Sequence, residues 1–354
     1  MYQPHENGGS AMNANMNLTV VGVDLAKNVF QLHFVDEETS EVKRLKLSRQ
    51  KFQQFFVNRA PCLIGMEACG GSHYWAREFL KLGHQVKVMP VSDVKAFNSG
   101  NKSDARDAQA IWAATRAGTT REVAVKTEEQ QAILSMHRIL ELKKVHRVGL
   151  TNQIRGLLTE FGLVVPTGFK ALREGLPKML EDLEQQAPKM LCEQIQDLWQ
   201  DILRLREQEN AIDQKLAVWA KTNADCQRLM EIPGVGLLTA TAVVATVGNA
   251  RVFKNGRQLA AFFGVAPAHT GSGGKIQVLG MSKRGDCYVR KLLVHCARTS
   301  VLLCKDPPKV VDRLKKKHHV NVVIGAMANR LCRIIWTLMK HETKYVKDYQ
   351  HLLT

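Results

Sequence analysis

The chain has 354 residues, and its 50 Lys and Arg residues outnumber its 33 Asp and Glu residues, which leaves a formal net charge of +17. The length predicts two or three domains, and a hydrophobic content of 45% is enough for packed cores. The basic excess favours a polyanionic partner such as nucleic acid, because each neutralised phosphate releases counterions. The sequence has neither an uninterrupted apolar run of about 18 residues nor a signal-peptide pattern, so we expect no membrane association.

Eight cysteines are scattered along the chain without a C-x-x-C pair. This spacing predicts neither a zinc site nor a disulfide framework, and it is typical of reduced core residues in a cytosolic protein. Residues 1–16 show no periodicity, so we expect a flexible leader, with Met16 as an alternative start.

Two short strands open the first domain. Residues 18–24 form a β-branched apolar run that ends in Asp24, and residues 29–35 alternate apolar and polar side chains. The pattern predicts two paired strands joined by a short turn. A carboxylate at the end of a buried strand is costly unless it is paired or bound to a metal, which makes Asp24 a candidate ligand.

A second acidic strand end follows. Residues 62–69 form an apolar strand that delivers Glu67 just before a glycine pair, and a helix is predicted over residues 74–82. Residues 85–89 predict another strand, which Pro90 closes.

The next helix begins with Asp104 and Asp107, which are three residues apart and therefore lie on one face. Adjacent carboxylates repel each other, but a hard cation such as Mg²⁺ between them removes the repulsion. The alternative is a solvated helix start, where Asp is favoured by the helix dipole. The predicted elements follow the order of an RNase H-like fold: two strands and an optional third, then strand, helix, strand and helix. In such a fold, acids that are distant in sequence meet at one edge of the sheet, where two cations can bind a phosphodiester.

Helices dominate the middle of the chain. Residues 127–130 read Thr-Glu-Glu-Gln, a capping box that predicts a helix to about Phe161. From Leu191 onward, apolar residues recur in alternating steps of four and three, with Glu209 at one seam position, which predicts a coiled coil with a Lys or Arg partner for Glu209. A packed helix within one domain is the alternative, and pairing within or between chains stays open. The seam consists of Leu191, Ile195, Leu198, Ile202, Leu205, Glu209, Ile212, Leu216 and Trp219.

Residues 229–240 predict the turn of a helix-hairpin-helix. Gly234 and Gly236 would allow close approach, and backbone N–H groups at the start of the next helix could hold a phosphate. A plain tight turn between two helices is the alternative.

Residues 262–275 form a glycine-rich loop in which Ser272 has glycine on both sides and Lys275 nearby. Such a serine could attack phosphorus if a base or metal activated it, although a flexible hairpin tip with an incidental serine fits equally. Residues 281–291 then gather basic residues around a helix start, which suits phosphate contacts or a solvated basic face. The candidates there are Lys283, Arg284 and Arg290.

In this order, the motifs resemble those of the DEDD transposases of bacterial insertion sequences. The first half carries VGVDLAKNVFQLH, LIGMEACGGSHYW and NKSDARDAQAI, and the second half carries IPGVGLLTATAVVATVG, FFGVAPAHTGSGGK and GMSKRGDCYVRKLL. The resemblance covers nearly everything from Asn17 to about Glu342 and points to the insertion-sequence one-ten family, with the closest fit to its one-one-one-one subgroup.

We expect an α/β plus α architecture in five segments, of which the resemblance implies the middle three. These are a flexible leader (1–16), a RuvC-like domain of RNase H-like fold (17–122), a helical coiled-coil linker (123–224), a mostly helical transposase domain with a helix-hairpin-helix-like motif and the serine loop (225–345), and a tail (346–354).

The resemblance also implies the chemistry. Asp24, Glu67, Asp104 and Asp107 would hold Mg²⁺, and Ser272 would attack DNA and form a covalent phosphoserine. A structured non-coding RNA, the bridge RNA, would pair with donor and target double-stranded DNA, and homodimers would assemble into a homotetramer with composite sites. The enzyme would work in the bacterial cytoplasm, associated with the nucleoid when bound to DNA.

Two departures and two alternative functions accompany this expectation. The leader before Met16 has no counterpart in the family pattern, and the loop has a single serine where some relatives have two, which leaves Thr270 and Ser282 as alternative nucleophiles. A RuvC-like structure-specific endonuclease would use the same acids with water as the nucleophile. A non-catalytic nucleic-acid-binding protein would show no metal-dependent cleavage.

Overall fold

The computed structural model describes residues 18–36, 38–98, 103–272 and 275–346. Packing divides the chain into an N-terminal unit, Met1–Thr127, and a C-terminal unit, Glu128–Thr354. The predicted leader, most of the predicted tail and the two residues after Ser272 lie outside the described residues. The five predicted segment boundaries stay predictions.

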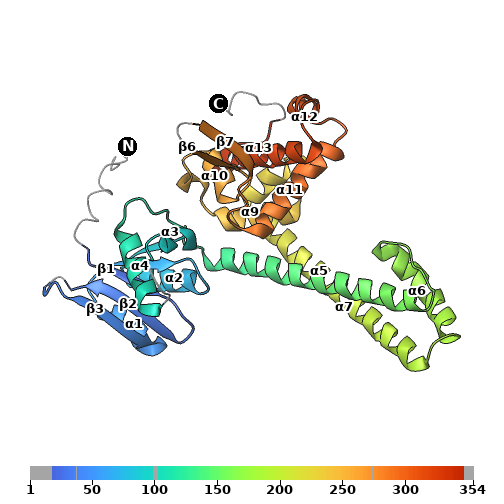
Figure 1. The fold of residues 1–354 in the computed structure, drawn as a ribbon, viewed down its shortest axis with the longest axis horizontal. Coiled ribbons are helices and arrows are strands. Elements are labelled where there is room, and N and C mark those ends of the chain that lie inside the picture. Colours follow the sequence, from blue (N-terminus) through green and yellow to red (C-terminus); the bar gives the residue numbers. More distant parts are fainter. Residues whose placement is uncertain (1–17, 37, 99–102, 273–274, 347–354) are drawn as a thin grey trace, which may run out of the picture. The chain divides into compact units, whose positions relative to one another are not determined.

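The N-terminal unit is built on a five-stranded mixed sheet with the order β3-β2-β1-β4-β5 (Figure 1). Strands β1, β4 and β5 are parallel, whereas β2 and β3 pair antiparallel with their neighbours. Its elements are β1 (Val20–Asp24), β2 (Val29–Val35), β3 (Val42–Ser48), α1 (Arg49–Val57), β4 (Leu63–Glu67), α2 (Ser72–Lys81), β5 (Gln85–Met89), α3 (Val91–Lys95) and α4 (Asp104–Arg116).

Most of these elements match the sequence predictions. Strands β2 and β5 have the predicted bounds, β3 confirms the optional strand, and α4 begins at Asp104 as expected. Helix α1 was not predicted from the sequence, and its buried residues Phe52 and Phe56 complete an aromatic core. In that core the rings of Phe30 and Phe52 stack with centroids 4.1 Å apart.

Two glycines let α4 lie directly on the sheet. Gly22 on β1 and Gly65 on β4 are register partners. A Cβ added to Gly22 would lie 2.5 Å from the Ala108 carbonyl oxygen, and one added to Gly65 would lie 1.7 Å from Thr115 Oγ1. The helix therefore rests on strand backbone, a close approach that only glycine permits.

The C-terminal unit is helical apart from one hairpin. Its elements are α5 (Glu128–Glu160), α6 (Phe169–Glu184), α7 (Lys189–Thr222), α8 (Ala224–Met230), α9 (Leu237–Val247), the 3₁₀ turn η1 (Ala250–Val252), α10 (Gly256–Phe262), β6 (Pro267–Ser272), β7 (Lys275–Met281), α11 (Cys287–Leu302), α12 (Lys309–Lys315) and α13 (Val320–His341).

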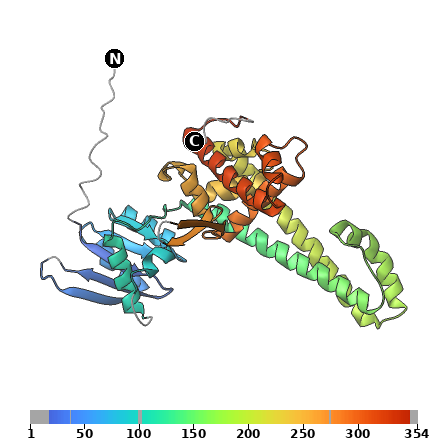
Figure 2. The same ribbon diagram turned by 45° about the horizontal axis from the view of Figure 1, so that its top comes forward.

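Helices α5 and α7 lie side by side and antiparallel, as both ribbon views show (Figures 1 and 2). The predicted seam is confirmed on α7, where Ile195, Ile202 and Leu216 are fully buried. The partner of this seam is α5 of the same chain. Glu209 has the predicted basic partner, because Arg147 Nε donates to Glu209 Oε1 over 2.8 Å, with both side chains largely buried.

A buried histidine joins α5 to two helices of the C-terminal core. His137 Nε2 lies 3.0 Å from Thr241 Oγ1 on α9, and its Nδ1 lies 3.0 Å from the Tyr288 hydroxyl on α11. The Thr241 hydroxyl already donates to the Leu237 carbonyl, so it accepts from Nε2–H, and Tyr288 donates to Nδ1. Burial lowers the pKa of His137 to about 4, with a smaller contribution from Lys144, and this keeps the imidazole neutral.

Helix α13 is the only helix in the described part of the chain that is long and apolar enough to cross a membrane. More than half of its apolar stretch is buried, and Val323, Ala328 and Ile335 pack in the core formed with α9, α10 and α11. All eight cysteines are free thiols, as the sequence predicts, but the expected core position is wrong for Cys69 and Cys287, which are exposed, and for Cys304, which is partly exposed.

Candidate active site

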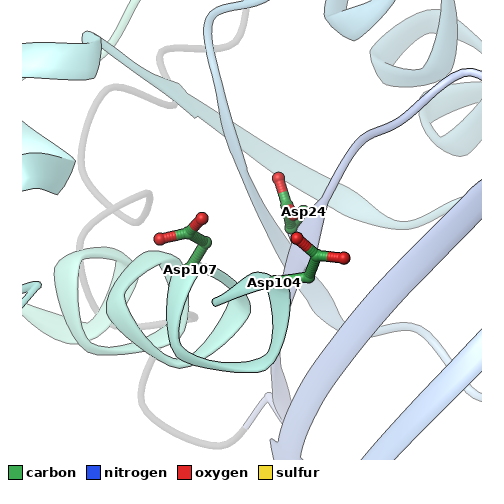
Figure 3. Close-up of side chains that lie close together, drawn as sticks. All are labelled: Asp24, Asp104 and Asp107. Carbon is green, nitrogen blue, oxygen red and sulfur yellow. The ribbon is translucent and has the colours of Figure 1, made fainter. Parts of the chain in front are cut away.

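Three of the four predicted acids form one cluster in the N-terminal unit. Asp24 at the end of β1 and Asp104 and Asp107 in the first turn of α4 each place one carboxylate oxygen within 4.8 Å of the others (Figure 3). Asp24 and Asp107 are half-buried, and Asp104 is exposed. The helix face that the sequence predicted for the aspartate pair therefore does meet the predicted strand end.

The glycine contact explains why these carboxylates meet. Side chains two residues apart on a strand share a face, so Asp24 emerges on the same face of the sheet as Gly22. Helix α4 lies on that face, with Ala108 against Gly22. One turn before Ala108, the helix start carries Asp104 and Asp107 to the end of β1.

A local hydrogen bond holds one of the three aspartates in place. Asn98 Nδ2 donates to Asp107 Oδ1 over 2.5 Å, which fixes one oxygen of that carboxylate. Both Asp104 and Asp107 lie in the first turn of α4, where the helix dipole favours negative charge.

Glu67, the fourth predicted acid, ends the neighbouring parallel strand. The register pairs Val23 with Met66, so Asp24 and Glu67 finish adjacent strands at the same edge of the sheet. The pKa of the Cys69 thiol is raised, mainly by burial and then by the negative charges of Glu67 and Asp24. Both carboxylates therefore lie close to Cys69. Glu67 is nevertheless not part of the group of three whose oxygens approach within 4.8 Å.

The donor set suits a hard divalent cation. Carboxylate oxygens are the ligands that Mg²⁺ and Mn²⁺ prefer, and three of them within 4.8 Å can bind a single ion. The half-exposed position leaves room for water or phosphate oxygens to complete the coordination. Metal binding would also remove the repulsion among the three charges.

The predicted nucleophile belongs to the other unit. Ser272 ends β6, opposite Lys275 at the start of β7, so the glycine-rich loop is the tip of an antiparallel hairpin. Of the alternatives, Thr270 is exposed on β6, and Ser282 donates its backbone N–H to the Ala266 carbonyl at the hairpin base. That Ser272 acts at the acid cluster stays a prediction.

The helix-hairpin-helix candidate joins α8 to α9. Gly234 has a positive φ of 89°, and a Cβ there would lie 3.0 Å from the Cys296 carbonyl oxygen on α11, so its close approach is to the protein's own backbone. Gly236 is exposed and precedes α9 with no atom within 4 Å of an added Cβ. A phosphate site at this turn stays a prediction.

The basic candidates near the hairpin have different environments. Lys275, Lys283 and Arg284 are exposed, and Lys283 has a positive φ of 55°. Arg290 on α11 donates to the Arg284 carbonyl over 3.1 Å and lies near two further carbonyls, so it holds the loop before α11. Their contacts with nucleic acid stay predictions.

The residues around the cluster were not predicted from the sequence. Asn98, Cys69 and the two contact glycines were not singled out. The strands carried a usable signal, because Gly-Val-Asp in β1 is repeated as Gly-Met-Glu in β4. A glycine two residues before an acid marks a face on which a helix can lie close to the carboxylate.

Comparison with known proteins identifies the family. A family model for the DEDD transposase of IS110, described as "Transposase", matches residues 21–162, and a second, described as "Transposase IS116/IS110/IS902 family", matches residues 226–311. The first implies an RNase H-like fold for the domain that contains the acid cluster, and the mixed sheet agrees with it.

Curated relatives align with nearly the whole chain. A "Probable family 20 transposase" of Pseudomonas aeruginosa is 39% identical over 93% of this chain and 99% of its own length. The "Transposase for insertion sequence element IS1328" of Yersinia enterocolitica is 35% identical over 94% and 99%, and that for IS1111A of Coxiella burnetii is 34% identical over 93% and 92%. With its acid cluster in the DEDD segment, the chain belongs to the IS110 family of insertion-sequence transposases.

Proposed function

We propose that this transposase cuts and rejoins DNA through a covalent phosphoserine at Ser272, with Asp24, Glu67, Asp104 and Asp107 holding Mg²⁺ at the reacting phosphate. The observation that carries the proposal is the acid cluster, in which three carboxylate oxygens approach within 4.8 Å of one another. Family membership supports the DNA substrate. When bound, the metal would stabilise charge that develops on the phosphate.

The chain's own residues have distinct roles in this proposal. Ser272 Oγ forms a bond to phosphorus while the bond from phosphorus to one deoxyribose oxygen breaks, and that oxygen leaves as a hydroxyl with the proton that serine gives up. A hydroxyl of the incoming strand then attacks the phosphoserine and releases Ser272. The energy of the broken bond is retained in the ester, so no high-energy cofactor is required.

Recognition and assembly complete the proposal. The resemblance to the one-ten family supports guidance by a bridge RNA, which would pair with both donor and target DNA and carry the sequence specificity, as in other guided enzymes. It also supports homodimers that assemble into a homotetramer with composite sites. The net charge of +17 suits two nucleic-acid partners, and we place the enzyme in the bacterial cytoplasm, on the nucleoid when it is bound to DNA.

A denaturing gel of the full-length protein with end-labelled DNA and its guide RNA tests the nucleophile. Ser272→Ala should abolish the slow-migrating covalent adduct and leave DNA and RNA binding largely unchanged. Thr270→Ala and Ser282→Ala are the matched controls and should retain the adduct. An adduct that persists in Ser272→Ala would exclude Ser272.

The same gel separates this mechanism from its alternatives. Free nicked ends without an adduct, produced equally by the wild type and Ser272→Ala, would indicate an endonuclease that uses water. Binding without metal-dependent cleavage, unchanged by Asp104→Asn, would indicate a non-catalytic nucleic-acid-binding protein.

A further inference from the structure

The β6–β7 hairpin has an apolar face that nothing in the described part of the C-terminal unit covers. Ile276 is 75% exposed and Val278 is 63% exposed, although both are aliphatic residues in a strand. The register pairs Gly271 with Ile276 and His269 with Val278, and cross-strand partners share a face. One face of the hairpin is therefore formed by two aliphatic side chains, an exposed histidine and a glycine.

The other residues of the hairpin differ in character. Thr270 pairs with Gln277 on the opposite face, and Leu279 of β7 is a further aliphatic residue that is 45% exposed. Exposed cations flank the hairpin at both ends, with Lys275 beside the tip and Lys283 and Arg284 after its base. The apolar face thus lies within a basic surround, in a chain that carries a net charge of +17.

Backbone hydrogen bonds attach the base of the hairpin to the preceding segment, so the base is held in place when the tip contacts a ligand. Ser282 N–H donates to the Ala266 carbonyl over 2.9 Å, and Lys283 N–H donates to the Gly264 carbonyl over 3.0 Å. A Cβ on Gly264 would lie 1.7 Å from the Arg284 carbonyl oxygen, so two backbone segments are in direct contact there. Figure 1 shows the two strands beside the helices that form the C-terminal core.

We propose that Ile276 and Val278 form a wedge that inserts between neighbouring base pairs of the bound DNA and unstacks them beside the phosphate to be cut. Apolar side chains inserted at a base step are a known way to kink a duplex, and one or two of them suffice. A stable protein partner would need roughly 800 Å² on each side, more than two aliphatic side chains supply. The basic surround also favours a phosphate backbone over another protein.

The inference rests on the proposed placement of the cut DNA at this hairpin. Unstacking would serve that reaction, because a base step that is opened gives the strand freedom to exchange. Ser272 ends β6 one residue after Gly271, the partner of Ile276, so the proposed wedge and the proposed nucleophile belong to the same end of the hairpin.

Fluorescence of 2-aminopurine tests the wedge. The full-length protein, with its guide RNA, is bound to duplexes that span an element end and carry the probe at successive positions. Wild type should raise the fluorescence several-fold at one step. Ile276→Ala and Val278→Ala should each reduce the rise, and the double variant should lose it, with an unchanged melting temperature. Leu303→Ala, which truncates another exposed aliphatic side chain (74% exposed), should behave as wild type.

Other outcomes overturn the inference or separate it from the nucleophile. A full fluorescence rise in the folded double variant would exclude the wedge, and loss of self-association with unstacking intact would show that this face binds protein. Ser272→Ala should still unstack the probe step. If the wild type forms no adduct but unstacks in an Ile276-dependent way, the phosphoserine proposal fails and the wedge stands.

Discussion

The two units of the chain position their important groups by opposite means. In the N-terminal unit, Gly22 and Gly65 remove side chains between a strand and α4, and the carboxylates follow from the direct contact of backbones. In the C-terminal unit, buried polar groups hold the long helices: Arg147 with Glu209, and His137 with Thr241 and Tyr288.

Substitutions are expected to affect the glycine contact and the buried polar pairs differently. A glycine contact has no partner that can be restored, so any larger residue forces the helix away from the sheet. A buried polar pair fixes the register between helices, and it can be replaced by a matched apolar pair once both partners change. Four substitution experiments test this contrast.

The largest effect is expected on DNA cleavage when the acid cluster is changed. Asp24→Asn or Asp107→Asn removes one negative ligand while it keeps the shape, and we expect strand cleavage to fall about 10²- to 10³-fold, the scale seen when a single electrostatic stabiliser is lost. Labelled-DNA cleavage and calorimetric titration with Mn²⁺ measure it. Glu41→Gln, an exposed acid elsewhere in the unit, is the control. Normal cleavage in both variants would show that the cluster is not the active site.

Next comes the ion pair between α5 and α7. Glu209→Leu leaves the Arg147 guanidinium largely buried without its partner, and we expect the free energy of unfolding to drop by about 3 kcal/mol. Adding Arg147→Met to Glu209→Leu should recover most of the loss. Urea denaturation of both single variants and the double variant gives the coupling energy. Additive losses would mean that the pair does not set the register.

The glycine contact should show the opposite behaviour. Gly22→Ala places a methyl group 2.5 Å from the Ala108 carbonyl oxygen, and we expect a loss of about 2 kcal/mol, together with weaker metal binding because α4 moves. Gly70→Ala is the matched control, since a Cβ there meets no atom within 4 Å. Equal stability of the two variants in urea would contradict direct contact between α4 and β1.

The smallest effect is the pH dependence of the C-terminal unit. The pKa of His137 is lowered from 6.5 to about 4 on folding, so the unfolded chain binds the extra proton between these values, and stability is lost as pH falls through this window. Between about pH 7 and about pH 5.5 this amounts to about 1 kcal/mol. His137→Gln should flatten the slope of unfolding free energy against pH, and an unchanged slope would assign the dependence to other groups.

Local patterns predicted much of this fold, and contacts between distant segments account for what was missed. Alternation along β2 and the acidic ends of β1 and β4 were visible because they depend on adjacent residues. The seam predicted a basic partner for Glu209 but not its identity, since α5 carries several basic residues and only packing selects Arg147. The stretch that forms α1 is nine residues long, too short for periodicity to stand out.

The candidate site shows the same limit. Asp104 and Asp107 could be assigned to one helix face from their spacing alone, and this prediction is confirmed. That α4 would rest on Gly22, and that Asn98 would hold Asp107, required the tertiary fold, because neither contact leaves a periodic signal. The place of Ser272 at the catalytic centre stays a prediction, since no pattern within one loop specifies which distant acids it meets.

The paired glycines have a consequence for how constant the spacing of the acids is. Side chains can change rotamer, but the atoms that separate α4 from the sheet at Gly22 are backbone atoms, which have no rotamers to exchange. The interval between the backbone of Asp24 and the backbone of the aspartates on α4 is thereby tied to covalent geometry and sheet hydrogen bonding. Temperature or a change of neighbouring side chains should alter that backbone interval very little, so only the rotamers of the three aspartates remain to adjust the spacing of their carboxylates.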